Sequence, residues 1–251
     1  MNLIIDIGNT RTKAAIFSKG KIRKKVIWEK CDLKTVKSFV ENLPDDKAGN
    51  KNITNAALSS TANVSKRVER FLQKEYFYIR LDHTTKLPIV NKYKTPKTLG
   101  KDRLAAVVGA FDIFPKKNNL VIDAGTCITY DFIDKKGNYH GGSIAPGMLM
   151  RLKAMNAFTA KLPLVEKKPL KSFIGNNTET SLRTGGQMGI VMEIRGFIAA
   201  YNKTFGKINT ILTGGDADFL AKHLETPLIV NNNLVLSGLN KILNYNVQLL
   251  E

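Results

Sequence analysis

The chain has 251 residues, 43% of them hydrophobic, and its 39 Lys and Arg against 21 Asp and Glu give a formal net charge of +18. This length and composition predict a globular protein that buries a substantial core in one large or two moderate domains. The positive charge would attract anionic partners, but the Lys are scattered, and no arginine-rich tract, zinc-finger spacing or aromatic-basic signature occurs, which argues against dedicated nucleic-acid binding.

The cysteines and the apolar runs bear on the cellular compartment. Cys31 and Cys127 lie far apart and outside any C-x-x-C pattern, so the sequence suggests neither a structural metal nor a disulfide framework. The N-terminus has no basic segment followed by a long apolar region, and no uncharged apolar run reaches the roughly 18 residues of a membrane span. We therefore expect a cytoplasmic protein that is neither exported nor membrane-spanning.

The first half of the chain alternates predicted strands and helices. Strands are expected at 3–7, 12–17, 25–28, 53–60 and 77–81, and helices at 33–43, 63–76 and 103–114. Pro96 and Gly100 break both periodicities and predict a loop at 92–103. This alternation indicates a sheet covered by helices.

The pattern restarts after PKKNN at 115–119, which is the best candidate for a domain boundary. An apolar run, an Asp, a Gly and a Thr occur again, with Asp123 placed 117 residues after Asp6. Further on we expect a strand and a glycine-proline loop at 138–147, helices at 148–158 and 178–205, a strand, glycine turn and helix at 208–224, and a loop at 231–233. The repeat predicts an internally duplicated fold.

Two Asp-Gly-Thr turns have the composition of a phosphate and magnesium site. A glycine lets backbone N–H groups approach phosphate oxygens, a hydroxyl adds a donor, and a carboxylate can hold Mg²⁺. One such turn, DIGNT at 6–10, is also common in ordinary hairpins. A second turn, DAGT at 123–126, and the glycine loop LTGGDA at 212–217 favour a site that grips a polyphosphate from two sides and admits a nucleoside.

In this order the three loops resemble the phosphate-1, phosphate-2 and adenosine loops of the acetate and sugar kinase, heat-shock chaperone and actin superfamily. The closer resemblance is to type III pantothenate kinases, and it covers essentially the whole chain. The motifs that carry it are DIGNTRTK at 6–13, GKDR at 100–103, DAGTCITYD at 123–131, GGSIAPG at 141–147, LP at 162–163 and NTETSLRTG at 177–185.

The resemblance implies an α/β fold of two related ribonuclease-H-like domains with a cleft between them, which is the duplicated actin-like ATPase fold. Residues 1–114 would form an N-terminal actin-like domain with the phosphate-1 loop and the substrate loop. Residues 115–251 would form a C-terminal actin-like domain with the phosphate-2 and adenosine loops.

The resemblance also implies ATP, Mg²⁺ and a monovalent cation, K⁺ or NH₄⁺, as cofactors. The implied ATP-binding residues are Asp6, Ile7, Gly8, Asn9, Thr10, Arg11, Thr12, Lys13 and Thr126. Asp6 would hold Mg²⁺ directly or through water, and Asp123 would hold the monovalent cation, which hard oxygen ligands suit. From the pattern alone, Lys13 is also compatible with an outward strand residue.

Asp102 is the residue on which the mechanism depends. The pattern alone makes it a carboxylate at a helix N-terminus that caps free N–H groups. The resemblance makes it the catalytic residue, which would orient the primary hydroxyl of pantothenate and accept its proton.

The resemblance implies further contacts to pantothenate. The implied substrate-binding residues are Tyr93, Gly100, Lys101, Asp102, Arg103 and Thr178. The guanidinium of Arg103 suits the pantothenate carboxylate because it can donate paired hydrogen bonds. From the pattern alone, Arg103 would form a surface salt bridge, Tyr93 would pack against neighbours and Thr178 would be a helix N-cap.

The implied function is ATP-dependent phosphorylation of pantothenate to 4′-phosphopantothenate, the first step of coenzyme A biosynthesis. Relatives are homodimers whose substrate pocket is completed across the interface, and the helix around Gly185, Gly186 and Gly189 is where two subunits would approach.

Two alternatives remain open from the sequence. One is a non-catalytic, nucleotide-binding transcriptional regulator of the same fold, and the other is a kinase for a sugar or another small alcohol. Asp6, Asp102, Arg103 and Asp123 together favour an enzyme. Arg103 also favours an acceptor that carries an acid over a neutral sugar.

Overall fold

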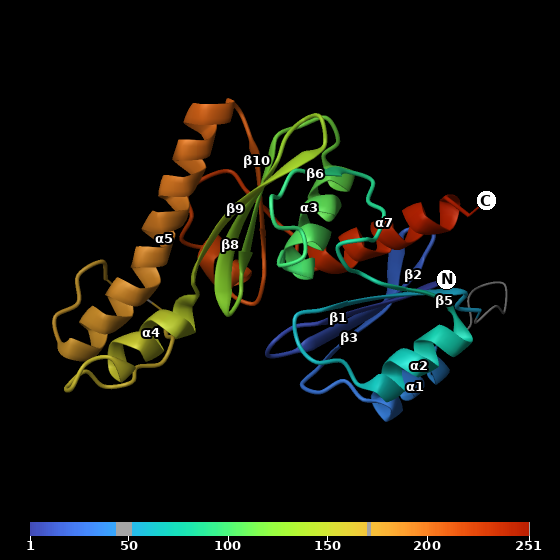
Figure 1. Ribbon diagram of the computed structural model, residues 1–251. Helices are drawn as coiled ribbons and strands as arrows, with labels where there is room; N and C mark the ends of the chain where they lie inside the picture. The colour runs from blue at the N-terminus through green and yellow to red at the C-terminus, as the bar shows by residue number, and fades with distance from the viewer. Residues whose placement is uncertain (44–51, 170–171, 251) are drawn as a thin grey trace. The chain divides into compact units, whose positions relative to one another are not determined.

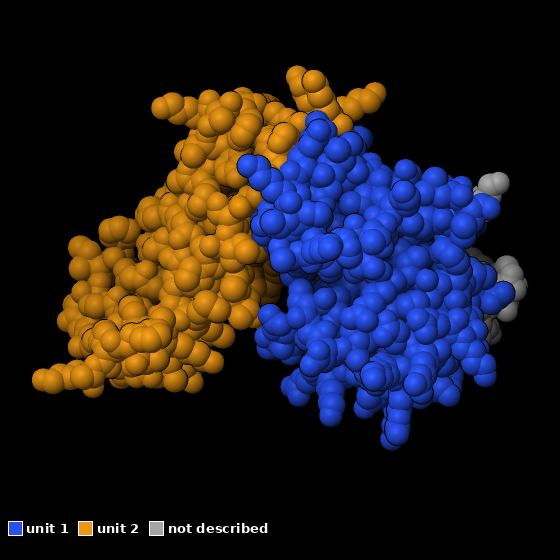
Figure 2. Space-filling view, viewed as in Figure 1, with its two compact units in different colours: residues 1–115, 137–139, 233–251 blue, residues 116–136, 140–232 orange. Residues whose placement is uncertain are grey.

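The computed structural model describes residues 1–43, 52–169 and 172–250. The chain forms two compact units (Figures 1 and 2): unit 1 comprises Met1–Pro115, Gly137–Tyr139 and Asn233–Glu251, and unit 2 comprises Lys116–Lys136 and His140–Asn232. Among the described residues, no helix combines the length and the apolar character that a membrane span requires.

Unit 1 is built on a five-stranded sheet. Its strands are β1 (Asn2–Ile7), β2 (Thr12–Ser18), β3 (Lys21–Trp28), β4 (Asn55–Ser60) and β5 (Phe77–Arg80), in the order β3-β2-β1-β4-β5. Helices α1 (Leu33–Glu41) and α2 (Lys66–Glu75) lie side by side on one face (Figure 1). Their apolar sides, including Val36 and Leu72, join Leu3 and Ile5 of β1 in one buried cluster, so the amphipathic pattern of both helices is explained.

Unit 2 repeats this plan. Its strands are β7 (Asn119–Ala124), β8 (Cys127–Ile133), most of β9 (Asn138–Pro146), β10 (Asn209–Thr213) and β11 (Ile229–Val230), in the order β11-β10-β7-β8-β9. The first two residues of β9 belong to unit 1, where they pair with β6 (Val90–Asn91). The helices are α4 (Met148–Ala157), α5 (Thr178–Phe205) and α6 (Ala217–Ala221). Ile190, Val191 and Ile194 of α5 pack with Leu120 and Ile122 of β7.

The duplication extends to single residues. In both units the first strand pairs antiparallel with the second and parallel with the fourth, in the same order across the sheet. Asn55 Nδ2 donates to Asn2 Oδ1 at 3.0 Å in unit 1, and Asn209 Nδ2 donates to Asn119 Oδ1 at 3.1 Å in unit 2. The duplicated α/β architecture expected from the repeated turns is thereby confirmed.

Two further helices complete unit 1, namely α3 (Lys101–Ile113) and α7 (Leu234–Gln248). They cross closely, because a Cβ on Gly238 would lie 1.8 Å from the Ala105 carbonyl oxygen and a Cβ on Gly109 would lie 2.6 Å from that of Leu234. Helix α7 in turn contacts β1, β2 and β4. The start of α3 is therefore held over the sheet through α7.

Most predicted elements are confirmed, but the two-residue strands β6 and β11 were not predicted, and three longer elements also differ. Helix α3 begins at Lys101, inside the expected loop 92–103, because Asp102 favours a first helical turn through the helix dipole. Strand β3 begins at Lys21 rather than at residue 25. Helix α7 was not predicted, although the spacing of Leu236, Leu239, Leu243 and their neighbours has helical periodicity.

Candidate active site

Asp6, near the end of β1, lies between two polar neighbours on adjacent strands. The strand registers place Lys13 of β2 and Ser59 of β4 directly opposite Asp6, so the three side chains share one face of the sheet. Ser59 Oγ donates a hydrogen bond to Asp6 Oδ1 at 3.0 Å. Lys13 therefore lies beside Asp6. Ser59 was not predicted, although it follows an apolar run as Asp6 does.

Burial raises the pKa of Asp6 from 3.8 to about 6. The hydrogen bond from Ser59 opposes this change, the negative charge of Asp102 adds to it, and the positive charge of Lys13 again opposes it. Because the charge of Asp102 raises the pKa of Asp6, the end of β1 and the first turn of α3 lie near each other in unit 1. At neutral pH Asp6 is mostly ionised and can attract a cation.

Asp102 lies in the first turn of α3, after the N-cap Gly100. Its Oδ1 accepts a hydrogen bond from the backbone N–H of Arg103 at 2.8 Å. A Cβ on Gly100 would lie 2.6 Å from this oxygen, so the glycine leaves room for the carboxylate. The expected place at a helix N-terminus is confirmed.

Arg103 is only 6% exposed, so the interpretation as a surface salt bridge is wrong. Its guanidinium carbon lies 5.8 Å from the ring centroid of Tyr93, which stacks on Tyr139 with centroids 6.2 Å apart and planes 9° apart. Lys101 Nζ donates to the Leu99 carbonyl oxygen at 2.9 Å. Tyr93 therefore packs against neighbours, as the pattern alone predicts, and one of these neighbours is the guanidinium of Arg103.

The first glycine turn projects from the β1–β2 hairpin. Gly8 N–H donates to the Arg11 carbonyl oxygen at 3.0 Å, which closes the turn tightly. Asn9, Thr10 and Arg11 are exposed. Ile7 and Thr12 are buried.

In unit 2 the second glycine turn touches two other predicted loops. Gly125 N–H donates to the Cys127 carbonyl oxygen at 2.9 Å, and Gly147 N–H donates to the Thr126 carbonyl oxygen at 3.1 Å. Gly214 has a φ of +101°, and a Cβ there would lie 2.3 Å from the Ala124 carbonyl oxygen, so only glycine suits this position. The predicted phosphate-2 and adenosine loops thus meet within this unit.

Asp123 has the same strand neighbourhood in unit 2 that Asp6 has in unit 1. Thr129 of β8 and Thr213 of β10 lie opposite it in the strand registers. Within the described part of the chain, the buried Thr129 Oγ1 has no hydrogen-bond partner. A buried oxygen of this kind beside a carboxylate fits a bound cation with oxygen ligands.

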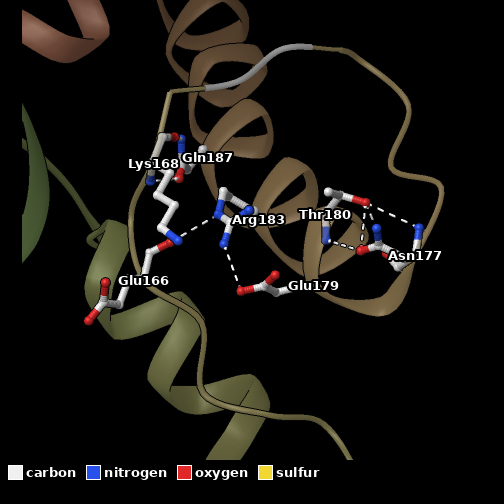
Figure 3. Close-up of polar contacts among 7 residues, drawn as sticks. All are labelled: Glu166, Lys168, Asn177, Glu179, Thr180, Arg183 and Gln187. Carbon is white, nitrogen blue, oxygen red and sulfur yellow. Dashed lines mark hydrogen bonds and ion pairs between the residues drawn. The ribbon is translucent and has the colours of Figure 1, made fainter.

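Figure 3 shows the start of α5, where Thr178 was expected as the N-cap. The cap is instead Asn177, whose Oδ1 accepts from Thr180 N–H at 2.9 Å in a capping box that Thr180 completes. Asn caps at least as well as Thr, so the cap is Asn177 and the helix begins at Thr178, the first residue of the predicted range. Thr178 is consequently the first helical residue and is exposed.

The first turns of α5 also hold an extended segment (Figure 3). Arg183 Nε donates to the Glu166 carbonyl oxygen at 3.0 Å, and its Nη2 pairs with Glu179 at 3.1 Å. The fully buried Gln187 exchanges two hydrogen bonds with the backbone of Lys168. Thr178 thus lies on a helix end that is fixed to its surroundings.

The predicted site residues therefore divide between the units. Asp6 to Lys13, Tyr93 and Gly100 to Arg103 belong to unit 1, and Asp123, Thr126 and Thr178 belong to unit 2. Among the described residues, no three His, Cys, Asp or Glu side chains gather as metal ligands.

Comparisons with known proteins agree with these features. A type III pantothenate kinase family model matches residues 2–200. A type III pantothenate kinase of Christiangramia forsetii is 42% identical over 246 residues, covering 98% of this chain and 99% of the relative.

Solved structures support the fold. A putative Baf family transcriptional activator from Campylobacter jejuni matches with a TM-score of 0.61 and 22% identity, covering 98% of this chain and 99% of the other. A glucokinase from an Antarctic psychrotroph matches with a TM-score of 0.53 and 12% identity, covering 97% and 98%. Since the family model spans most of the sequence and the curated relative matches nearly its full length, the chain belongs to the type III pantothenate kinase family.

Proposed function

We propose that this protein transfers the γ-phosphoryl group of ATP to the primary hydroxyl of pantothenate, giving 4′-phosphopantothenate and ADP in the first step of coenzyme A biosynthesis. The main observation behind the proposal is that Asp6 and Asp102 lie near each other in unit 1. The residue after Asp102 is the buried Arg103. This reaction requires three groups: a carboxylate for the metal, a carboxylate for the acceptor hydroxyl and a guanidinium for an acid-bearing acceptor.

Each residue then has a distinct task. Asp102 orients the acceptor hydroxyl and takes its proton as the hydroxyl oxygen bonds to the γ-phosphorus and the bond to ADP breaks. Arg103 holds the pantothenate carboxylate through paired hydrogen bonds, beside Tyr93. Gly100 and Lys101 form the start of the same helix and complete the acceptor loop.

Asp6 is the proposed ligand for Mg²⁺, directly or through water. Mg²⁺ usually takes one or two carboxylates together with substrate phosphates and waters, which suits a site without a cluster of protein ligands in the described chain. When bound, Mg²⁺ neutralises charge on the phosphates. The residues from Ile7 to Lys13 and Thr126 are the proposed phosphate contacts, supported by the exposure of Asn9, Thr10 and Arg11 in the first glycine turn.

Asp123 is the proposed ligand for a monovalent cation, K⁺ or NH₄⁺. The duplicated fold supports this, because the position of Lys13 beside Asp6 in unit 1 is taken by Thr129 beside Asp123 in unit 2. Unit 1 supplies an ammonium group of its own there, whereas unit 2 supplies a neutral hydroxyl whose buried oxygen lacks a partner within the described residues.

A homodimer is the proposed assembly, with Thr178 contributing to the acceptor site. Exposed apolar side chains gather in the sequence around α4 and the start of α5: Leu149, Phe158, Leu164, Phe173 and Ile174. Among the described residues, nothing lies within 4 Å of a Cβ built on Gly185 or Gly189, whereas Gly186 faces Leu152 of its own chain. Gly185 and Gly189, rather than Gly186, are therefore the glycines available to a second subunit.

We place the protein in the cytoplasm. Its proposed substrate ATP and the free thiols of Cys31 and Cys127 support this location.

The test is an ADP-release assay with purified protein, ATP, Mg²⁺ and K⁺, comparing pantothenate, sugars and no acceptor. Stimulation by pantothenate alone is the expected result. ATP binding without stimulation by pantothenate would favour the non-catalytic regulator, and stimulation by a sugar would favour a different acceptor.

A further inference from the structure

A chain of polar contacts in unit 2 connects the centre of the sheet to the turn before α4. Tyr130 Oη donates to Glu193 Oε1 at 2.7 Å, and Arg151 Nη2 donates to Glu193 Oε2 at 2.5 Å. Arg151 Nε donates in addition to the carbonyl oxygen of Pro146 at 2.9 Å. Strand β8, helix α5 and helix α4 are thus joined by one carboxylate and one guanidinium.

The contact at Pro146 is passed on through a single peptide group. The Pro146 carbonyl and the Gly147 N–H belong to the same peptide plane, and the Gly147 N–H donates to the Thr126 carbonyl oxygen at 3.1 Å. Because a peptide group is rigid, Arg151 at one edge and Thr126 at the other fix its rotation. A Cβ on Gly147 would lie 2.3 Å from the Gly125 carbonyl oxygen, so this approach requires glycine.

These contacts form a closed ring. Thr126 immediately precedes β8, and Tyr130 is the fourth residue of that strand, so the covalent chain joins the two ends of the contact path. Tyr130 is fully buried, and its pKa is raised by burial and by Glu193, so the hydroxyl stays protonated and donates. Both carboxylate oxygens of Glu193 accept a hydrogen bond. Removing Tyr130, Glu193 or Arg151 would therefore leave another polar group of the ring without its partner.

We propose that Glu193 and Arg151 are positioning residues of the nucleotide site: through the Pro146–Gly147 peptide they set the position of the Thr126 turn that holds the ATP phosphates. This inference rests on the proposed function, which assigns Thr126 to ATP. Neither side chain is assigned to the nucleotide itself, so their effect on ATP is indirect.

The experiment compares Glu193→Gln and Arg151→Lys with Glu225→Gln. Glu225 is largely exposed, lies outside the ring and pairs at 3.2 Å with Arg195, which is on α5 like Glu193. The control therefore makes the same Glu-to-Gln substitution in an ordinary surface ion pair. Arg151→Lys keeps the charge but has a single nitrogen, which cannot serve Glu193 and Pro146 in the same geometry. The measurements are ATP affinity by calorimetry without acceptor, amide exchange at Gly147, the KM for each substrate and Tm.

Both ring variants should weaken ATP binding about tenfold and speed exchange of the Gly147 amide, because a charge-assisted hydrogen bond is lost. The KM for ATP should rise while that for pantothenate changes less than about twofold, and the double variant should resemble either single one. Glu225→Gln should match the wild type. Tyr130→Phe is the substitute variant if Glu193→Gln does not fold. It keeps the buried ring and should weaken ATP binding in the same direction, but by less.

Unchanged ATP affinity and unchanged Gly147 exchange in the two ring variants would overturn the proposal. So would equal losses for ATP and pantothenate that follow the fall in Tm, because these would indicate a purely structural role. ATP binding and Gly147 exchange need no acceptor. A wild-type protein that binds ATP but does not phosphorylate pantothenate would therefore refute the proposed function and still leave this inference measurable.

Discussion

Asp102, in the first turn of α3, lies close enough to Asp6 of β1 for its negative charge to add to the pKa increase that burial causes. The two carboxylates are brought together by packing, because α3 crosses α7 at Gly109 and Gly238, and α7 contacts the sheet that holds Asp6. This relationship underlies the first predictions.

Asp6→Asn should change how stability depends on pH. The folded protein retains the Asp6 proton up to about pH 6, whereas the unfolded chain releases it near 3.8. The stability that this group contributes is therefore present below pH 3.8 and is lost as the pH rises through about 6. Relative to the wild type, the variant should gain up to about 3 kcal/mol between about pH 4 and about pH 8, measured by urea unfolding. Asp112→Asn, at a half-exposed position paired with Lys241, is the control; a gain no larger than that of the control would contradict the raised pKa.

Asp102→Asn should remove much of the turnover while preserving the fold and ATP binding. The amide is nearly isosteric but cannot accept the proton of the acceptor hydroxyl, so kcat should fall about 10²- to 10⁴-fold. The measurement is ADP release at saturating substrates, with Asp112→Asn near the other end of α3 as control. A loss below about tenfold would reduce Asp102 to a residue that stabilises the helix start.

Arg103→Lys should raise the KM for pantothenate about 10- to 100-fold with a smaller change in kcat. A lysine cannot donate the paired hydrogen bonds that a carboxylate accepts from a guanidinium. Pantothenol, which lacks the carboxylate, should be phosphorylated equally well by both proteins. Arg80→Lys alters a surface ion pair with Glu69 and is the control; it should leave the KM for pantothenate unchanged. If pantothenol lost as much as pantothenate, Arg103 would not be the carboxylate partner.

Gly238→Ala should destabilise the protein by about 1–3 kcal/mol or more, because its Cβ would lie 1.8 Å from the Ala105 carbonyl oxygen and would push α3 away from α7. Activity should fall as well, since the shift moves Asp102. Gly196→Ala on α5 meets nothing within 4 Å among the described residues and should be neutral or stabilising by up to about 1 kcal/mol. Urea unfolding of both variants checks this, and equal stabilities would contradict the close crossing.

Thr129→Val should abolish stabilisation by K⁺. A cation that binds the folded state raises Tm with its concentration, so the wild type should be more stable in KCl than in tetramethylammonium chloride of equal ionic strength. Thr226→Val is the matched control, because Thr226 also has a buried hydroxyl without a partner in the described chain. A full potassium effect in Thr129→Val would exclude this hydroxyl as a ligand.

The sequence by itself determined most strands and helices, the repeated Asp-Gly-Thr turns and the family. These features depend on local properties. The spacing of apolar residues predicts a strand or a helix, and a glycine beside a carboxylate predicts a tight polar turn. Asp6, Asp102 and Asp123 could be selected on that basis together with the family resemblance.

Only the tertiary structure decided which distant residues meet. The burial of Arg103 beside Tyr93, the place of Ser59 beside Asp6 and the peptide contact between Gly147 and Thr126 depend on how strands register and helices cross. Sequence periodicity identifies the face of an element that is buried, but not the partner that covers it, because many apolar faces are interchangeable. The choice is made by close backbone contacts, such as that of Gly238 with Ala105, which exist only after the chain has folded.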